Sequence, residues 1–334
     1  MLSSFKLSLD IIKTTGLQGH PFLLYLKPTA RCNLRCKSCN RWQDESSISE
    51  EMPLDEIREV LTKFRKAGLA VCTLWGGEPT LRSDLPEILA SAKQLGYRTA
   101  MCTNCLVLAK KADQILPNLD TLLCSLDGYG EAHDRFRGVE GLFDSVVKAM
   151  EIATAKYPNC YIKIWASVHK GSYDQVEKLA ELAKRFGAGI EYFPISRIEG
   201  YNDDQVADKE DLDRIFGKII ELKHKGYPVY NPDKVLKVMQ HEEPFSCNFG
   251  RAAIHLDHQG NVYSCEDSAG TPRHNWCHHS EFDPEKVFKS EKFAQVMSGL
   301  RECNCCRLPC VVELSGSLFR SLAGMFLSRR KWIA

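Results

Sequence analysis

Three cysteines near the start of the chain have the spacing of ligands to a metal cluster. Cys32, Cys36 and Cys39 follow a C-x3-C-x2-C pattern, directly after an apolar run at residues 21–27 that predicts a β-strand. Cysteine thiolates hold iron–sulfur clusters, and a cubane has four irons to ligate. Three closely spaced cysteines therefore leave one iron open for a small molecule, whereas a structural metal site is normally closed by a fourth ligand. A zinc site and three unrelated thiols are the alternatives.

A second motif follows the next predicted strand. Residues 71–75 are an apolar run, and residues 76–79 read Gly-Gly-Glu-Pro. Together with the cysteine triplet, this tetrapeptide resembles the radical S-adenosylmethionine (radical SAM) superfamily, because both motifs occur in the right order and each directly after a strand. The residue before the third cysteine is often aromatic in that family and is Ser38 here, so stacking of adenine at this position is not expected.

The composition is that of a globular chain. It has 334 residues, of which 44% are hydrophobic and 26% charged, enough for one large domain or a large and a small one. Forty-four basic and 43 acidic residues give a formal net charge of +1, which offers no signature of nucleic-acid binding. No secretory signal is visible, so the 15 cysteines are expected to be metal ligands or buried thiols rather than disulfides. No apolar run reaches the ~18 residues that suggest a membrane-spanning helix.

Short apolar runs alternate with segments of helical period through the first two thirds of the chain. The predicted strands are residues 22–27, 71–75, 98–103, 121–126, 161–168 and 189–193. The predicted helices are residues 53–67, 84–95, 108–116, 141–156, 173–186 and 208–225. This alternation argues for right-handed βαβ units and a parallel sheet. Six such units fit the α/β fold that the resemblance implies, a partial, TIM-like (β/α)6 barrel.

The composition changes after a proline-containing boundary. Beyond it lie seven cysteines, two predicted strands at residues 254–257 and 262–264 around a hairpin turn, and a predicted helix at 283–300. This part is expected to form a small, cysteine-rich α+β extension. The predicted organisation is an N-terminal extension, the barrel, a linker, the cysteine-rich domain and an amphipathic tail, at residues 1–20, 21–226, 227–246, 247–313 and 314–334.

The motifs are expected to share one site. Ligands of parallel α/β barrels collect at the carboxyl ends of the strands, and four of the predicted strand ends carry a motif. By resemblance to the superfamily, the cysteine triplet holds a [4Fe–4S] cluster whose fourth iron is chelated by SAM. The residues that the resemblance assigns to SAM are Gly76, Gly77, Glu78, Pro79, Asn104, Ser125, Asp127 and Arg137. Glycines let the backbone approach a ligand without a Cβ, and an arginine fork suits a carboxylate. Taken singly, each motif has an ordinary turn or cap as its alternative.

The later cysteines resemble a SPASM or shortened twitch extension, which carries auxiliary [4Fe–4S] clusters. The candidate ligands of a second cluster are Cys247, Cys265, Cys303, Cys306 and Cys310, with Cys305 as a spare and Cys277 set among histidines. A structural zinc site is the alternative, because it accepts the same Cys and His side chains. The remaining cysteines are expected to pack in the core as small apolar residues: Cys72, Cys102, Cys105, Cys124 and Cys160. Cys105 is the exception to watch among them, because it follows Asn104 at the rim of the expected site.

The resemblance implies an enzyme that reductively cleaves SAM and abstracts hydrogen from a substrate, and oxidation or other modification of a small molecule is expected. A peptide or lipid-linked substrate and a metal-binding regulatory module without catalysis are the alternatives. The expected partners are SAM, a reductant such as flavodoxin or ferredoxin, and no nucleic acid.

No catalytic acid or base is identified from the sequence. Glu191, Glu199 and Glu266 are candidates, but solvated surface positions are expected for all three. The expected location is cytoplasmic, with membrane-surface contact through the tail at residues 314–334 as the alternative to docking of this helix on the barrel.

Overall fold

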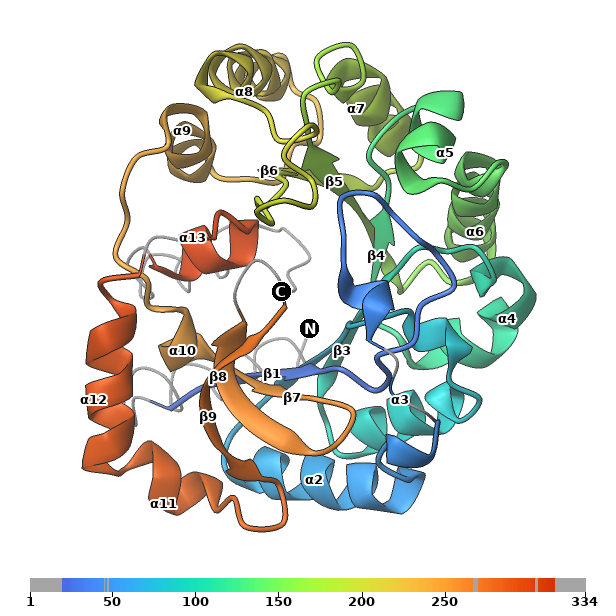
Figure 1. Ribbon diagram of the computed structural model, residues 1–334. Helices are drawn as coiled ribbons and strands as arrows, with labels where there is room; N and C mark the ends of the chain where they lie inside the picture. The colour runs from blue at the N-terminus through green and yellow to red at the C-terminus, as the bar shows by residue number, and fades with distance from the viewer. Residues whose placement is uncertain (1–19, 45, 47, 267–269, 304–305, 316–334) are drawn as a thin grey trace.

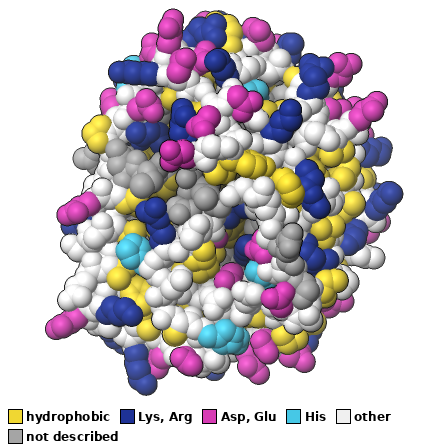
Figure 2. All heavy atoms as spheres, viewed as in Figure 1, with side chains coloured by type: hydrophobic (Ala, Val, Ile, Leu, Met, Phe, Trp, Pro, Cys, Tyr) yellow, Lys and Arg dark blue, Asp and Glu magenta, His cyan; other side chains and the backbone are white. Residues whose placement is uncertain are grey.

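The computed structural model describes residues 20–44, 46, 48–266, 270–303 and 306–315. A single nine-stranded sheet forms the framework, in the order β6-β5-β4-β3-β2-β1-β7-β8-β9. Strands β1 to β7 run parallel, and β8 and β9 are antiparallel additions at one edge. The sheet curves into an open barrel with helices on its outside (Figure 1). Figure 2, in the same view, shows a depression in the centre of this face.

The predicted barrel elements all form, with ends that differ by at most three residues. The strands are β1 Leu23–Leu26, β2 Val71–Leu74, β3 Arg98–Thr103, β4 Thr121–Ser125, β5 Tyr161–Val168, β6 Gly189–Pro194, β7 Ala253–Leu256, β8 Asn261–Glu266 and β9 Pro272–His278. The helices are α2 Leu54–Lys66, α3 Leu85–Gln94, α4 Leu108–Ile115, α5 Glu131–Arg137, α6 Leu142–Lys156, α7 Val176–Arg185, α8 Lys209–His224, α9 Asp233–His241, α10 Phe249–Ala252, α11 Pro284–Phe288, α12 Glu291–Leu300 and α13 Pro309–Ser315.

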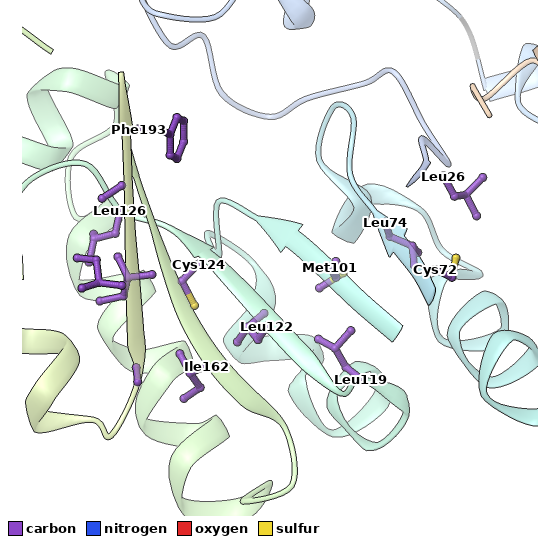
Figure 3. Close-up of a cluster of buried hydrophobic side chains, with 14 of the residues drawn as sticks. Leu26, Cys72, Leu74, Met101, Leu119, Leu122, Cys124, Leu126, Ile162 and Phe193 are labelled. Atoms are coloured by element: carbon purple, nitrogen blue, oxygen red, sulfur yellow. The ribbon is translucent and has the colours of Figure 1, made fainter. Parts of the chain in front are cut away.

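The main core lies between the outer face of the sheet and the helices. Helix α2 shows why: its apolar residues recur at helical spacing, and Ile57, Leu61 and Phe64 are fully buried against the sheet. Alternate residues of the strands point outward into this layer, as Figure 3 shows for Cys72 and Cys124 among leucine and methionine side chains. These two cysteines therefore pack as small apolar residues, as predicted.

The segment predicted as a linker, residues 227–246, contains helix α9. Pro232 occupies the N-cap position of this helix, where its missing N–H costs nothing. Leu236 and Met239 are fully buried in the core that α9 shares with the barrel helices. Part of this segment is therefore helical and packs on the barrel.

The cysteine-rich extension continues the sheet of the barrel. Strand β7 pairs in parallel with β1, from Leu23 opposite Ala253 to Leu26 opposite Leu256. The helix predicted at 283–300 is divided into α11 and α12, because the Ser290 hydroxyl accepts a hydrogen bond from the Phe293 N–H and starts a new helix.

Two predicted segments fall largely outside the described residues. These are the N-terminal extension, of which only His20 is described, and the amphipathic tail, of which only Leu314 and Ser315 are described. Among the described residues, none of the helices has the length and apolar character needed to cross a bilayer.

Candidate active site

A cavity of about 140 Å³ lies at the carboxyl ends of strands β1 to β4. Cys32, Cys36 and Cys39 all line it, so the loop after β1 presents the three thiols to one space. The predicted SAM contacts that line the same cavity are Gly76, Gly77, Glu78, Asn104, Ser125 and Arg137. Pro79 and Asp127 are buried but do not line it.

The two glycines allow the loop after β2 to pack backbone to backbone against the cysteine loop. A Cβ on Gly77 would lie 2.1 Å from the Arg31 carbonyl oxygen and 2.4 Å from that of Ala30. Gly76 has a φ of +120°, and a Cβ there would lie 2.3 Å from Cγ of Lys27. Only glycine tolerates both the backbone angle and the close approach. The glycines therefore shape the wall of the cavity next to the cysteines.

Replacing Gly77 by alanine is expected to weaken SAM binding about tenfold or more. The added methyl group meets two carbonyl oxygens of the main chain, which must shift at a cost on the order of 1–3 kcal/mol. Isothermal titration of SAM into the anaerobically reconstituted protein measures the change.

Gly299→Ala provides the matched control. Gly299 lies in helix α12, a Cβ there would meet nothing within 4 Å, and alanine is the better helix former. This variant should keep the SAM affinity of the wild type and melt at an equal or higher temperature. Equal SAM affinity in Gly77→Ala would contradict the role given to this glycine.

The Glu78 carboxylate is hydrogen-bonded by other residues of the chain. It accepts hydrogen bonds from the Thr80 N–H at 3.1 Å, the Thr103 hydroxyl at 2.7 Å and the Asn104 N–H at 2.8 Å. Burial raises the pKa of Glu78, and these hydrogen bonds oppose that rise. The Asn104 side chain in turn donates to the Asn33 side chain at 2.8 Å. Glu78 thus joins the loop after β2 to the end of β3, and Asn104 extends the connection to the cysteine loop.

Arg137 is held beside the cysteines by a buried carboxylate. Asp127, whose side chain is inaccessible to solvent, accepts from Nε of Arg137 at 2.6 Å and from the Ser167 N–H at 2.8 Å. Burial alone would raise the pKa of Asp127, but the charge and hydrogen bond of Arg137, the neighbouring His133 and the Ser167 N–H together lower it. The guanidinium also lies next to Cys36, where it opposes the rise that burial causes in the pKa of this thiol. Asp127 therefore positions an arginine that faces the cavity.

Sequence reasoning missed part of the cavity wall. The additional lining residues are Leu34, Arg41, Trp42, Trp75, Cys102 and Thr103. Most of them lie within three residues of a recognised motif, so their neighbourhood in sequence was the available signal. Cys102 was expected in the core but faces the cavity, with its sulfur 3.6 Å from the Ser125 hydroxyl.

Tyr201, which follows β6, contacts the cysteine loop from the far side of the barrel. Its hydroxyl donates to the Cys39 carbonyl at 3.1 Å and accepts from Nε1 of Trp42 at 3.2 Å. Nothing in the sequence around Tyr201 points to this contact.

Two glutamates expected at the surface are buried, and this expectation was wrong for them. Glu191 is 3% exposed and forms an ion pair with Lys163 at 3.2 Å inside the barrel. The Glu266 side chain is 5% exposed and pairs with Arg41, whose guanidinium lies 4.7 Å from the Trp75 ring centre. Both residues occupy strand positions that face the barrel interior. In the sequence, a polar residue at such a position gives the same alternating pattern as a residue that faces solvent. Glu199 is exposed, as expected.

Four of the later cysteines lie close enough to influence one another electrostatically. Burial raises the pKa of Cys306, and the neighbouring Cys247, Cys310, Cys303 and Cys265 raise it further. Burial and two of the same neighbours, Cys247 and Cys303, raise the pKa of Cys265 to about 12. The four belong to β8 and to segments flanking α10 and α12, so the fold gathers them from distant parts of the sequence.

The two remaining candidates differ from this group. The Cys310 thiol also neighbours Cys306 but forms its hydrogen bond with the Tyr25 hydroxyl. Cys277 is influenced by Glu281 and two lysines rather than by another cysteine. Cys305 lies outside the described residues.

The arrangement of the cysteines around the cavity can be compared with what a cluster needs. Among the described residues, no three His, Cys, Asp or Glu side chains converge closely enough to hold one metal ion. A cubane is ligated at separate irons, so its thiolates surround it instead of meeting at a point. Three thiols around one cavity, next to a glycine wall that a Cβ would fill, fit a three-cysteine cluster with a ligand beside it.

The comparison with family models agrees with this geometry. Residues 26–183 match the radical SAM superfamily model. The barrel part of the chain is thus similar to radical SAM domains. The matched residues include the cysteine loop, the glycine loop and Arg137.

Relatives and solved structures extend the likeness. The chain is 30% identical over 217 residues to AdoMet-dependent heme synthase of Methanosarcina barkeri, covering 63% of this chain and 61% of the relative. It is 34% identical over 126 residues to Fe-coproporphyrin III synthase of the same organism, covering 36% of this chain and 31% of the relative. The crystal structure of Streptococcus suis SuiB bound to S-adenosylmethionine has a similar fold, with a TM-score of 0.68 at 18% identity over 89% of this chain and 74% of SuiB. The chain thus spans less than two thirds of the length of either curated relative.

Proposed function

We propose that this protein is a radical SAM enzyme that modifies a small molecule. Cys32, Cys36 and Cys39 would hold a [4Fe–4S] cluster, and the adjoining cavity would hold SAM. The observation that carries the proposal is the single cavity that the three thiols share with the glycine loop and Arg137. When bound, a reduced cluster with SAM supplies one-electron cleavage of SAM to methionine and a 5′-deoxyadenosyl radical, which abstracts hydrogen from a substrate.

The residues of the chain position these groups. Gly76 and Gly77 let the backbone approach the methionyl part of SAM. Asp127 holds the Nε edge of the Arg137 guanidinium, so that the arginine faces the cavity and suits the SAM carboxylate. Ser125 and Asn104 would contact the ribose. Glu78 and Asp127 therefore act as positioning residues, since both of their carboxylates are engaged by the chain.

Cys247, Cys265, Cys303 and Cys306 would hold a second, auxiliary cluster in a SPASM- or twitch-type extension. Their mutual electrostatic influence supports this set. Cys310, which also neighbours Cys306, would be the reserve ligand, because its thiol is hydrogen-bonded to the Tyr25 hydroxyl. A flavodoxin or ferredoxin would supply the electron, in the cytoplasm.

A small-molecule substrate is favoured by the curated relatives, whose names are those of heme and coproporphyrin synthases. Solved SuiB also occurs with its precursor peptide SuiA, but at 17% identity that likeness concerns the fold alone.

Anaerobic reduction with dithionite in the presence of SAM tests the proposed activity. We expect 5′-deoxyadenosine and methionine to accumulate, and we expect Arg137→Leu to lower the rate at least tenfold by weakening SAM positioning. Arg135→Leu, two residues away on an exposed side chain, is the matched control and should not change the rate. Absence of 5′-deoxyadenosine with a fully loaded cluster would instead favour a metal-binding regulatory module.

A further inference from the structure

The inner face of the barrel carries a cross-strand row of mostly polar and aromatic residues below the cavity. Strand register places six residues side by side on β8, β7, β1, β2, β3 and β4: Tyr263, His255, Tyr25, Thr73, Ala100 and Thr121. We call these six residues the inner row. Trp75, two residues beyond Thr73, lies between this row and the cavity and lines the cavity.

Several polar atoms of this region are buried without a hydrogen-bond partner in the described structure. They are Nδ1 and Nε2 of His255, the hydroxyls of Thr73 and Thr121, and Nε1 of Trp75. A buried donor or acceptor without a partner costs free energy, and native proteins rarely leave one so. Five such atoms around one part of the barrel interior indicate that something outside the described chain binds there.

His255 is the centre of this group. It is 5% exposed, and burial lowers its pKa to about 4, so the imidazole is neutral with one donor and one acceptor nitrogen. Tyr25 and Tyr263 stack on its two faces, each at a centroid distance of 5.1 Å. Trp75 meets it edge to face at 5.6 Å. Because rings cover both faces, the nitrogens at the ring edge are the polar points that His255 offers.

The composition of the inner row differs from that of a packed barrel core. Closed (β/α)8 barrels fill their interior with layers dominated by branched apolar side chains. Here an imidazole, two threonine hydroxyls and aromatic rings occupy the corresponding positions. The charged residues nearest to the row are paired with one another, Lys163 with Glu191 and Arg41 with Glu266. Within the part of the chain that the structure describes, the row therefore offers hydrogen bonds and flat apolar surfaces, but no unpaired charge for an ionic group.

We propose that the inner row is a substrate subsite, in which His255, Thr73 and Trp75 hydrogen-bond an uncharged hydroxyl, amide or ring N–H/C=O group on a flat apolar molecule. The subsite lies beside the cavity assigned to SAM, so a substrate anchored there is held next to it. This assignment adds a substrate-binding site to the proposed function. It depends on the proposed function only in identifying the bound molecule as the substrate.

The first test measures the thermal stability of the reconstituted protein without any substrate. His255→Phe and His255→Leu remove the two unpaired nitrogens, so we expect at least one of them to raise the melting temperature by about 2 °C or more. Two apolar variants are needed because phenylalanine is larger than histidine and can overpack the cage. A fall in melting temperature for both variants would overturn the proposal, since it would show that the nitrogens are satisfied within the fold.

The second test compares three probes, phenol, toluene and benzoate, in ligand-observed NMR titrations of the reconstituted protein with SAM. The wild type should bind phenol about tenfold more tightly than toluene, because hydrogen bonds of phenol replace the missing partners. Benzoate should bind no better than toluene, since none of the described residues places a free cation at the row. His255→Phe should abolish the preference for phenol, and His255→Gln, which keeps a donor and an acceptor, should retain it.

His258→Phe is the matched control for the probe series. His258 is also buried with both nitrogens unpartnered, but it lies in the hairpin turn after β7, outside the inner row. This variant should keep the preference for phenol. Tighter binding of benzoate than of phenol would overturn the proposal. An equal preference for phenol in the wild type and in His255→Phe would also overturn it, because water would then be enough to hydrogen-bond the unpartnered atoms of the row. Neither readout uses SAM cleavage, so failure here is distinguishable from failure of the proposed function.

Discussion

Replacing Cys32, Cys36 and Cys39 together by alanine should lower the iron content of the anaerobically reconstituted protein from about eight atoms per chain to about four. The three thiols line one cavity, while the other cysteine group lies at β8 and around α10 and α12, so the two sites should load independently. The same variant should form no 5′-deoxyadenosine. Iron and sulfide analysis and product chromatography measure both effects.

A reciprocal variant and a core control sharpen this experiment. Cys306→Ala should remove iron from the second site and leave four atoms at the first. Cys72→Ala should leave the iron content unchanged, because Cys72 is fully buried in the outer core, away from both groups. A wild type with about four irons that falls to none in the triple variant would overturn the auxiliary cluster and leave the later cysteines as structural ligands.

Lys163→Met should destabilise the fold by about 3–5 kcal/mol. The Lys163 and Glu191 side chains are 2% and 4% exposed, and removing the lysine leaves a buried carboxylate without its counter-charge. The ammonium also lies 4.2 Å from the Tyr230 ring centre, so its loss removes a cation–π contact. Urea unfolding of the apo-protein gives the change in free energy.

The double variant Lys163→Met/Glu191→Leu separates pairing from burial. With both charges gone, most of the lost stability should return, since an apolar pair of similar volume is often neutral relative to a buried ion pair. Arg135→Met is the surface control: the Arg135 and Glu131 side chains are 71% and 88% exposed, and their pair should contribute well under 1 kcal/mol. A loss below about 1 kcal/mol in Lys163→Met would contradict a buried, mutually dependent pair.

The main features of the candidate site could be predicted from where its motifs lie relative to the predicted strands. Cys32, Gly76 and Asn104 each follow a predicted strand and Ser125 lies near the end of one, and parallel strands bring such positions to one edge of a sheet. The structure has these strands in adjacent places, and all four residues line one cavity. A local pattern of strand followed by motif was therefore sufficient to expect a common site, because the βαβ topology leaves little choice about where strand ends meet.

The roles within the site depended on contacts that no local pattern contains. From the sequence, Glu78 and Asp127 were predicted to bind the ligand. In the structure, Glu78 accepts hydrogen bonds from Thr103 and Asn104 on β3 and its loop. Asp127 accepts from Ser167 and Arg137. These partners are brought close only when the sheet forms.

By itself, then, the sequence determined the alternation of strands and helices, the order of the motifs and the cysteine pattern, because these follow from local periodicity and spacing. Only the tertiary structure decided which face of each strand looks into the barrel. Glu191 and His255 lie at such positions, and an inward polar residue of an open barrel shows the same alternation as an outward, solvated one. Burial depends on what closes over a residue, and the helices and strands that cover these two come from distant parts of the chain.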